Sequence, residues 1–376
     1  MTRRLKITTV VGTRPEIIRL AATIKRLDTF TDHVLVHTGQ NYDYELNEVF
    51  FEDLGLRRPD YFLEADTSSL GAVLGSVLIK IEAVLLEEKP DAMLVLGDTN
   101  SCISALMARR LKIPVYHMEA GNRCFDENVP EEVNRRMVDH VADYNLVYTE
   151  HARRNLLAEG IHPSRILLTG SPMREVLDAN AAAIAASDVL ERQGLTVGGY
   201  FLVSLHREEN VDNAARLTSV LHALNELADE YGVPVLVSTH PRTRKHLEDQ
   251  PQDLKDKLFF HPPFGFNDYI KLQQSAKLVL SDSGTISEES SILGFPAVTL
   301  RDSVERPEAL DSGAIITAGV TKNSILDSVE MVLSDPRRLG GQAIPAGYEV
   351  TDASRRTVNF IRSTAATHSY RAGIRK

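Results

Sequence analysis

The sequence has little of what marks secreted or metal-binding proteins. Only two cysteines, Cys102 and Cys124, occur in 376 residues, and they lack the spacing of a metal site. We expect both to be free thiols in a reducing cytoplasm, so a disulfide between them is the less favoured alternative.

Long apolar runs and an excess of positive charge are also missing. No stretch is long enough to span a bilayer, and the start MTRRLKITTVV has too short an apolar run for a signal peptide. The chain has 42 Lys and Arg against 52 Asp and Glu, a formal net charge of -10. This balance argues against nucleic-acid and membrane partners and leaves a small anionic ligand possible only where arginines are local.

What the chain does contain is an alternation of apolar strands and helices. Near-continuous apolar runs are typical of strands buried on both faces of a parallel sheet and joined by right-handed helical crossovers. The predicted strands are 6–12, 33–39, 92–98, 114–119, 144–149, 165–170, 201–206, 233–240, 257–262, 277–284, 295–301 and 313–319. The clearest predicted helices are 69–88, 129–141 and 353–366. The pattern predicts an α/β protein of doubly wound, Rossmann-like domains.

The length of the chain exceeds what one hydrophobic core normally organises, so we expect two domains. The alternation breaks in the alanine-rich segment 179–199, where we place the connection. The predicted domains are therefore 1–178 and 179–352. Two such domains facing each other across a cleft would hold a ligand at the carboxyl ends of strands from both.

The first strand-to-helix turn has the features of a phosphate site. Arg14 lies at the expected start of a helix, whose N-terminus attracts anions, and Arg19 lies one turn further on. The alternative is an ordinary turn with solvated arginines.

A second turn, in SDSGTISEES, favours a diphosphate more strongly. Ser283, Gly284 and Thr285 are small enough to let backbone N–H groups approach phosphate oxygens. Glu289, one turn into the helix, could accept hydrogen bonds from ribose hydroxyls. The structural alternative is a capping box of Thr285 and Glu288, with Glu289 facing water.

Two predicted neighbouring strands each end in a histidine with an arginine close behind. These are His206 with Arg207, and His240 with Arg242. One such histidine is usually an edge residue, but two favour a ligand site. Zinc is the alternative, which the absence of an H-x-x-x-H pattern and of nearby cysteines disfavours, so we expect no metal.

The stretch HMEAGNRCFDENVPEEVNRR, residues 117–136, concentrates charge behind an apolar strand. Glu119 ends that strand and Asp98 ends another, and ionic groups at buried strand ends are costly unless something uses them. With Glu131 as a third carboxylate close by, the set suits proton transfer. Like charges crowded at a partly desolvated site would raise at least one pKa.

A structural explanation exists for the helix within this stretch. Asn128 and Glu131 could form a capping box, and Glu131–Arg135 and Glu132–Arg136 could pair along the helix. This explanation leaves both strand-end carboxylates unaccounted for. The arginines of the stretch that we take as ligand-binding candidates are Arg123 and Arg135.

An ordered series of motifs carries a family resemblance. The motifs GTRPEIIRL, HTGQNYD, LGDTNS, HMEAGNR, PEEVNRR, HREEN, SDSGTISEES and RDSVERPEAL resemble those of the non-hydrolysing UDP-N-acetylglucosamine 2-epimerase superfamily along nearly the whole chain. The resemblance implies a glycosyltransferase-B-like fold, a last helix within 353–376 that returns to the first domain, a homodimer, and no nicotinamide or obligatory metal.

The resemblance also implies a chemistry and roles for residues. In the family, C2 of the sugar is deprotonated and UDP leaves C1 to give a 2-acetamidoglycal, to which UDP then re-adds. The acid/base candidates are Asp98, Glu119 and Glu131, with His206 near the diphosphate. The implied UDP-binding residues are Arg14, Ser283, Gly284, Thr285 and Glu289, and Arg135 and Arg306 fall at further family arginines.

Departures from the usual motifs indicate the substrate. The N-acetylglucosamine enzymes usually have EAGLRT, TGQH and DSGG, where this chain has EAGNRC, TGQN and DSGT. With STHPRT, these variants resemble the subgroup that converts UDP-2-acetamido-2,6-dideoxy-L-talose to UDP-N-acetyl-L-fucosamine for surface polysaccharides, our leading hypothesis. Asn41 in place of the TGQH histidine weakens the expectation of allosteric activation by UDP-N-acetylglucosamine.

Several alternatives remain open at this point. The first is epimerisation of UDP-N-acetylglucosamine to UDP-N-acetylmannosamine. A glycosyltransferase on the same fold needs an acceptor site and usually one base, so the abundance of carboxylates disfavours it. A hydrolysing relative and a non-catalytic sensor complete the set, and a sensor would be expected to have lost the carboxylates.

Overall fold

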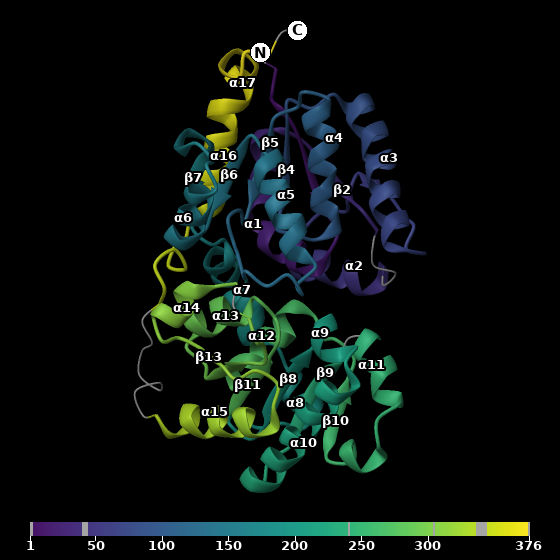
Figure 1. The fold of residues 1–376 in the computed structure, drawn as a ribbon, viewed down its shortest axis with the longest axis vertical. Helices are drawn as coiled ribbons and strands as arrows, with labels where there is room; N and C mark the ends of the chain where they lie inside the picture. Colours follow the sequence, from purple (N-terminus) through teal and green to yellow (C-terminus); the bar gives the residue numbers. More distant parts are fainter. Residues whose placement is uncertain (1–2, 40–43, 240, 304, 336–343, 375–376) are drawn as a thin grey trace. The chain divides into compact units, whose positions relative to one another are not determined.

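The computed structural model describes residues 3–39, 44–239, 241–303, 305–335 and 344–374 (Figure 1). It divides into two compact units: unit 1 is Met1–Ala179 with Gly347–Lys376, and unit 2 is Asn180–Ala346. The chain passes from unit 1 to unit 2 inside helix α7 (Met173–Ala186), because the alanine-rich segment is helical rather than an open linker.

Unit 1 is built on a parallel sheet. Among its described residues, seven strands lie in the order β3-β2-β1-β4-β5-β6-β7. The strands are β1 (Lys6–Val11), β2 (Asp32–His37), β3 (Tyr61–Phe62), β4 (Ala92–Leu96), β5 (Val115–Met118), β6 (Tyr144–Val147) and β7 (Ile166–Leu168). The helices are α1 (Arg14–Phe30), α2 (Tyr44–Asp53), α3 (Leu70–Glu88), η1 (Asn100–Ile103), α4 (Ser104–Arg110), α5 (Glu131–Val141), α6 (Glu150–Ala158), η2 (Pro163–Arg165), α16 (Ala353–Thr364), η5 (Ala365–Thr367) and α17 (His368–Arg371).

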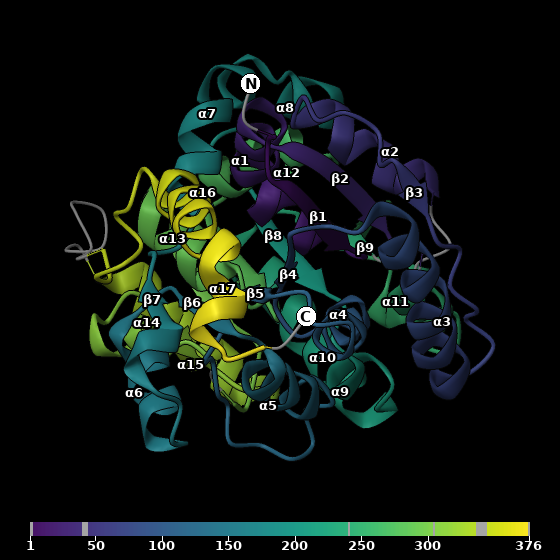
Figure 2. The ribbon, with the colours of Figure 1, turned by 90° about the horizontal axis from the view of Figure 1, so that it is seen from above.

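The C-terminal helix α16 packs against α1 and so belongs to unit 1 (Figure 2). Phe360 meets the rings of Tyr116 and Tyr144 edge-on, with centroids 6.1 and 5.3 Å away. The Tyr116 hydroxyl lies 2.6 Å from the Thr364 hydroxyl. Strands β5 and β6 therefore hold the end of the chain through aromatic packing and buried hydrogen bonds.

Unit 2 has a second parallel sheet. Its described residues form six strands in the order β10-β9-β8-β11-β12-β13. The strands are β8 (Phe201–Leu205), β9 (Val235–Thr239), β10 (Leu258–His261), β11 (Leu278–Ser281), β12 (Ala297–Thr299) and β13 (Ile316–Thr317). The helices are α8 (Val189–Gln193), α9 (Glu208–Val211), α10 (Ala214–Tyr231), α11 (Pro241–Glu248), η3 (Gln252–Leu254), α12 (Phe266–Ser275), α13 (Ile286–Leu293), α14 (Pro307–Asp311) and α15 (Lys322–Ser334).

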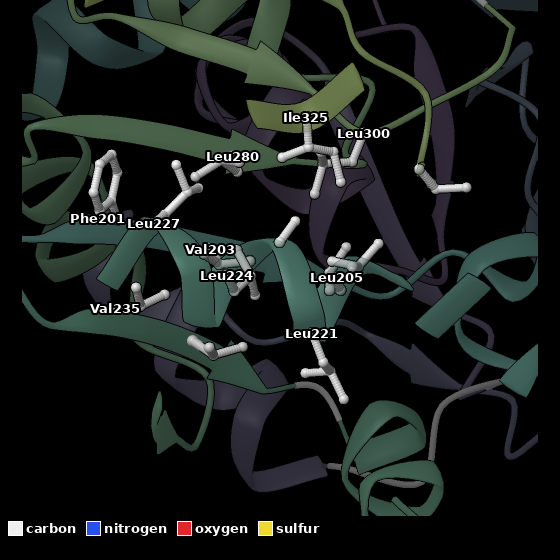
Figure 3. Packing of buried hydrophobic residues seen from close by; sticks show 14 of the residues in the cluster. Phe201, Val203, Leu205, Leu221, Leu224, Leu227, Val235, Leu280, Leu300 and Ile325 are labelled. Carbon is white, nitrogen blue, oxygen red and sulfur yellow. The ribbon is translucent and has the colours of Figure 1, made fainter. Parts of the chain in front are cut away.

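Alternate residues of the strands fill the core of unit 2. Phe201, Val203 and Leu205 point from β8 into one cluster with Leu224 of α10 and Ile325 of α15 (Figure 3). All five are 2% exposed or less. Because helices cover both faces of the sheet, the strands appear in the sequence as continuous apolar runs. The predicted α/β fold of two Rossmann-like, glycosyltransferase-B-like units is confirmed.

Every predicted strand coincides with an observed one, but several end earlier. The strand predicted to reach residue 98 ends at Leu96, since Gly97 adopts φ +71° and turns the chain. The strand predicted to reach 284 ends at Ser281. Strand β3 was not predicted, because two residues are too short for a periodic pattern.

The predicted free thiols are confirmed, since neither Cys102 nor Cys124 forms a disulfide. Within the described ranges, no helix combines the length and apolarity needed to cross a bilayer.

Candidate active site

The candidate residues cluster where the strand order of each sheet reverses, the usual ligand site of open α/β sheets. In unit 1 the reversal lies between β1 and β4, followed by Arg14 and Asp98. In unit 2 it lies between β8 and β11, followed by His206 and Ser283. Local sequence thus places each residue at a strand end, and topology brings these ends together within each unit.

The two strand-end carboxylates lie at adjacent tips, as predicted. Strands β4 and β5 pair with Leu96 opposite Met118, and Asp98 and Glu119 follow directly. Both side chains are partly exposed, 26% and 11% respectively, so solvent or a ligand can reach them.

An arginine meets each of these carboxylates, which the expectation of crowded like charges did not include. Arg19 Nη1 donates to Glu119 Oε2, and Arg135 Nε donates to Asp98 Oδ2 at 3.0 Å. Both arginines are buried, at 5% and 2% exposure. Each carboxylate is therefore held in place by a buried guanidinium group.

The backbone at Glu119 is strained. Its φ of +64° lies in the left-handed region, which a residue with a Cβ adopts at a cost of about 1–3 kcal/mol. Asn122 Nδ2 lies 3.4 Å from Glu119 Oε1. Such strain persists only where the surroundings hold it, and it is typical of functional sites.

Glu132, which the sequence predicted only as a partner of Arg136, accepts hydrogen bonds from several groups around the first turn of α5. Its Oε2 accepts from Arg135 Nη1 at 3.0 Å and from the Cys124 N–H at 3.2 Å, and Oε1 accepts from Arg136 at 2.9 Å. Burial opposes ionisation, but these donors outweigh it and hold the pKa of Glu132 below its usual value. Glu132 thereby positions Arg135, which in turn holds Asp98.

The expected capping box at this helix is absent. Asn128 bonds to Asp126 Oδ1 at 2.8 Å, and Pro130 occupies the N-cap without a side-chain bond. The predicted Glu132–Arg136 pair is present. Glu131 opens α5 and is half-buried, next to Glu132.

Arg123 is engaged in a buried network away from the strand tips. Its Nη1 lies 2.7 Å from Asp139 Oδ2, and its Nη2 lies 2.6 Å from Glu159 Oε2. The guanidinium is wholly buried. The structure thus places this ligand-binding candidate among protein carboxylates.

The turn after β1 carries Arg14 at the first position of α1. The Arg14 guanidinium lies over the ring of Phe50, 5.7 Å from its centroid. The half-buried side chain at a helix N-terminus retains the features of the predicted anion site.

A buried carboxyl group, Glu16, joins this turn to the turn that carries Asp98. It accepts from the Gly12 N–H at 3.1 Å, from the hydroxyls of Thr13 and Thr99 at 2.7 and 3.0 Å, and from the hydroxyl of Ser101. Burial raises its pKa to about 7, although these donors act in the opposite direction. The sequence could have indicated Glu16 as a site residue, because it lies in the first turn of a helix that follows a strand.

In unit 2, Asp282 organises the strand ends. Its carboxylate accepts from the backbone N–H groups of His206 and Arg207 at 3.1 and 3.0 Å, and from Asn210 Nδ2 at 3.2 Å. The His206 ring Nδ1 lies 3.0 Å away. Burial opposes ionisation, but the His206 charge and these donors keep the pKa of Asp282 low.

The turn after Asp282 is open where its neighbours are buried. Ser283, Gly284 and Thr285 are half-buried, whereas Ile286 is buried. The Ser283 and Thr285 hydroxyls lie 2.9 Å apart. No side chain caps α13, so the Thr285 capping box is wrong and the turn remains suited to an anion.

Two arginine–glutamate contacts surround Gly284. Arg207 and Arg301 both reach Glu305 Oε1, at 3.4 and 2.8 Å. Arg306 Nε donates to the Gly284 carbonyl at 2.9 Å. The clustering of three guanidinium groups at one turn suits a diphosphate.

Glu289 does not face water, contrary to the structural alternative. It is 7% exposed, and Gln273 Nε2 donates to its Oε2 at 2.6 Å. His240 and Asn41 lie outside the described residues.

Comparisons with known proteins agree with this geometry. The family model described as UDP-N-acetylglucosamine 2-epimerase matches residues 24–362. The solved UDP-N-acetylglucosamine 2-epimerase from Rickettsia bellii is 46% identical with a TM-score of 0.92, covering 98% of each chain. The Methanocaldococcus jannaschii UDP-GlcNAc 2-epimerase, solved with UDP-GlcNAc and UDP, is 37% identical with a TM-score of 0.89, covering 96% of this chain and all of its own.

A further relative carries a different substrate name. The UDP-2,3-diacetamido-2,3-dideoxy-D-glucuronate 2-epimerase of Pseudomonas aeruginosa is 36% identical over 91% of this chain and 96% of its own. The family match covers most of the chain, and these relatives share it nearly end to end. The chain therefore belongs to the UDP-N-acetylglucosamine 2-epimerase family.

Proposed function

We propose that this protein epimerises C2 of a UDP-2-acetamido sugar, with unit 2 supplying most of the UDP-binding residues and unit 1 supplying the acid and base together with Arg14. The observation that carries the proposal is the pair Asp98 and Glu119, at adjacent strand tips and each beside an arginine. Two carboxylates of this kind suit removal of a proton from one face of C2 and its return to the other.

The proposed reaction conserves atoms and charge. A carboxylate takes the C2 proton, the C2–H electrons form the C1=C2 bond, and UDP leaves with the C1–O electron pair. UDP then re-adds to C1 while C2 receives a proton on the opposite face. Asp98, Glu119 and Glu131 are the proposed proton carriers, and His206 the proposed partner of the diphosphate.

The remaining candidate site residues have different surroundings, and we assign their roles accordingly. We propose that Arg14, Arg207, Ser283, Gly284, Thr285 and Arg306 bind the diphosphate and Glu289 the ribose, with His240 an untested member. Arg19 and Arg135 hold the carboxylates and meet the sugar. Arg123, which is saturated by Asp139 and Glu159, is better assigned to structural support.

For the sugar itself, we propose UDP-2-acetamido-2,6-dideoxy-L-talose, converted to UDP-N-acetyl-L-fucosamine. Support comes from the motif variants, because the Asn122 side chain contacts Glu119 and Cys124 Sγ lies 3.3 Å from Glu132 Oε2. UDP-N-acetylglucosamine is the second candidate, favoured by the names of the relatives.

The test incubates the enzyme with each UDP-sugar separately and follows products by NMR. We expect turnover of the L-talo substrate far above that of the D-gluco substrate. Comparable or faster turnover of the D-gluco substrate would make the second candidate the function, and turnover of neither would refute epimerisation of both.

We further propose a homodimer formed through α3. Ile79 and Leu86 lie seven residues apart on one face of this helix and are 71% and 54% exposed, unusual for large apolar side chains. Light scattering should give twice the 41.7 kDa chain mass, and Ile79→Lys should give the monomer. A monomeric wild type would refute this.

A further inference from the structure

A buried histidine lies beneath the turns that carry Asp98 and Glu119. His117 is in β5 and is 0% exposed. Its ring Nδ1 lies 2.9 Å from Asp139 Oδ1, and its Nε2 lies 2.7 Å from the carbonyl oxygen of Gly97. A buried histidine with a partner at each nitrogen has a fixed orientation.

Both partners of this ring accept hydrogen bonds. The Gly97 carbonyl cannot donate, so Nε2 must carry a proton. Asp139 Oδ2 accepts from Arg123 Nη1 at 2.7 Å and from the Gly121 N–H at 3.1 Å. The His117 ring is therefore held between the Gly97 carbonyl, to which Nε2–H donates, and a carboxyl group that is itself fixed by two donors.

The pair reaches both catalytic turns. Gly97 immediately precedes Asp98, and Gly121 lies two residues after Glu119. His117 holds the first turn through the Gly97 carbonyl, and Asp139 holds the second through the Gly121 N–H. The left-handed backbone of Glu119 needs such a restraint from outside the turn.

The carboxyl group of Asp139 also belongs to a buried ion pair. Its partner is Arg123, whose other side meets the partly exposed Glu159 just after α6. Arg123 and Asp139 are both wholly buried, so removing either side chain leaves an uncompensated charge.

We propose that His117, oriented by Asp139, is a positioning residue that sets the turns of Asp98 and Glu119 for proton transfer. The role rests on the proposed epimerase function. Misplacing a catalytic group by about 1 Å can cost about 10²-fold in rate, which sets the expected effect.

The first test measures the ¹⁵N shifts of the His117 ring in wild-type enzyme carrying labelled histidine. We expect Nε2 to carry a proton, because the Gly97 carbonyl that it faces can only accept a hydrogen bond. A ring with an unprotonated Nε2 overturns the proposal, whatever the variants do. This readout needs no substrate, so it is independent of the proposed function.

The second test measures kinetics of His117→Asn and Asp139→Asn. We expect kcat to fall about 10²-fold with little change in KM, because UDP binding is assigned elsewhere. The matched control is His222→Asn, an exposed histidine on α10 of unit 2, which should keep wild-type kcat.

Thermal unfolding separates positioning from folding. A folded variant with unchanged kcat overturns the proposal, whereas reduced kcat in a folded enzyme supports it. If neither variant folds, the wild-type ring shifts decide. A wild-type enzyme without epimerase activity would refute the proposed function. The ring shifts would then still test whether Nε2 of His117 carries a proton.

Discussion

Three carboxyl groups at the strand ends of unit 1 differ in their surroundings. Asp98 and Glu119 each face a guanidinium, whereas Glu16 faces hydroxyl groups and an N–H in a buried position. Arginine stabilises the ionised form, and burial beside neutral donors stabilises it much less. Residue type alone would have given all three the same chemistry.

At this scale, Glu119→Gln should keep the fold and UDP binding but lose turnover. Glutamine keeps the size and a contact to Arg19 but cannot carry the proton, an effect of about 10²–10⁴-fold in kcat. The control is Glu127→Gln, an exposed carboxylate in the same segment. Full activity of Glu119→Gln would shift the proposed role to Asp98 or Glu131.

Glu16→Gln should change how stability depends on pH. The Glu16 pKa is about 7 in the folded protein against an ordinary 4.5, so between these values the unfolded chain has lost a proton that the folded protein retains. Wild-type stability therefore falls as pH rises through this window, by on the order of 3 kcal/mol at about 1.4 kcal/mol per pKa unit.

The measurement is the melting temperature of both proteins from pH 4.5 to pH 8. Glutamine cannot ionise, so the difference should move in favour of the variant as pH rises, even if lost hydrogen bonds lower its stability at every pH. Parallel curves would show that Glu16 does not titrate in this window.

At the scale of elements, helix α16 completes unit 1 from the far end of the chain. Its amphipathic pattern is visible in the sequence, but its neighbours, α1 and the Tyr116–Tyr144 pair, lie more than 200 residues earlier. Elements of unit 2 intervene, so local sequence contains no signal for the contact. The family resemblance was the source of that expectation.

Ile361→Ala should destabilise unit 1 selectively. Ile361 is 0% exposed on α16, and removing a buried isoleucine typically costs about 2–5 kcal/mol. Both cysteines lie in unit 1 and Cys102 is fully buried, so thiol reactivity during urea titration reports this unit. The control is Asn359→Ala, exposed on the same helix. Equal midpoints would mean that α16 does not stabilise unit 1.

At the scale of the whole molecule, the proposed function assigns nucleotide binding mainly to unit 2, with Arg14 added from unit 1, and proton transfer to unit 1. Each unit has its site at the reversal of strand order. The division explains why arginines and small residues gather after β8 and β11, and carboxylates after β4 and β5.

Elimination and re-addition predict exchange with solvent. In D₂O the wild-type enzyme should place deuterium at C2 of the product, because the proton returned comes from a carboxylate in contact with water. Long incubation should also release small amounts of UDP and glycal. Epimerisation with no deuterium at C2 would contradict the proton-transfer roles of Asp98, Glu119 and Glu131 together.

The sequence by itself determined the order of strands and helices and the residues at their ends, because these depend on local periodicity and turn chemistry. Asp98, Glu119, Arg14 and Ser283 were placed just after strands in this way, where the structure has them. The ends of strands were less certain, since a turn at Gly97 depends on one backbone angle.

Only the tertiary structure decided which groups meet. The Arg19–Glu119 contact joins residues 100 positions apart and the Arg135–Asp98 contact residues 37 apart. The tertiary structure also places Arg123 beside Asp139 and provides a hydrogen-bond partner for both nitrogens of His117. The charge and protonation of a side chain depend on distance and burial, which chain folding sets and local sequence does not contain.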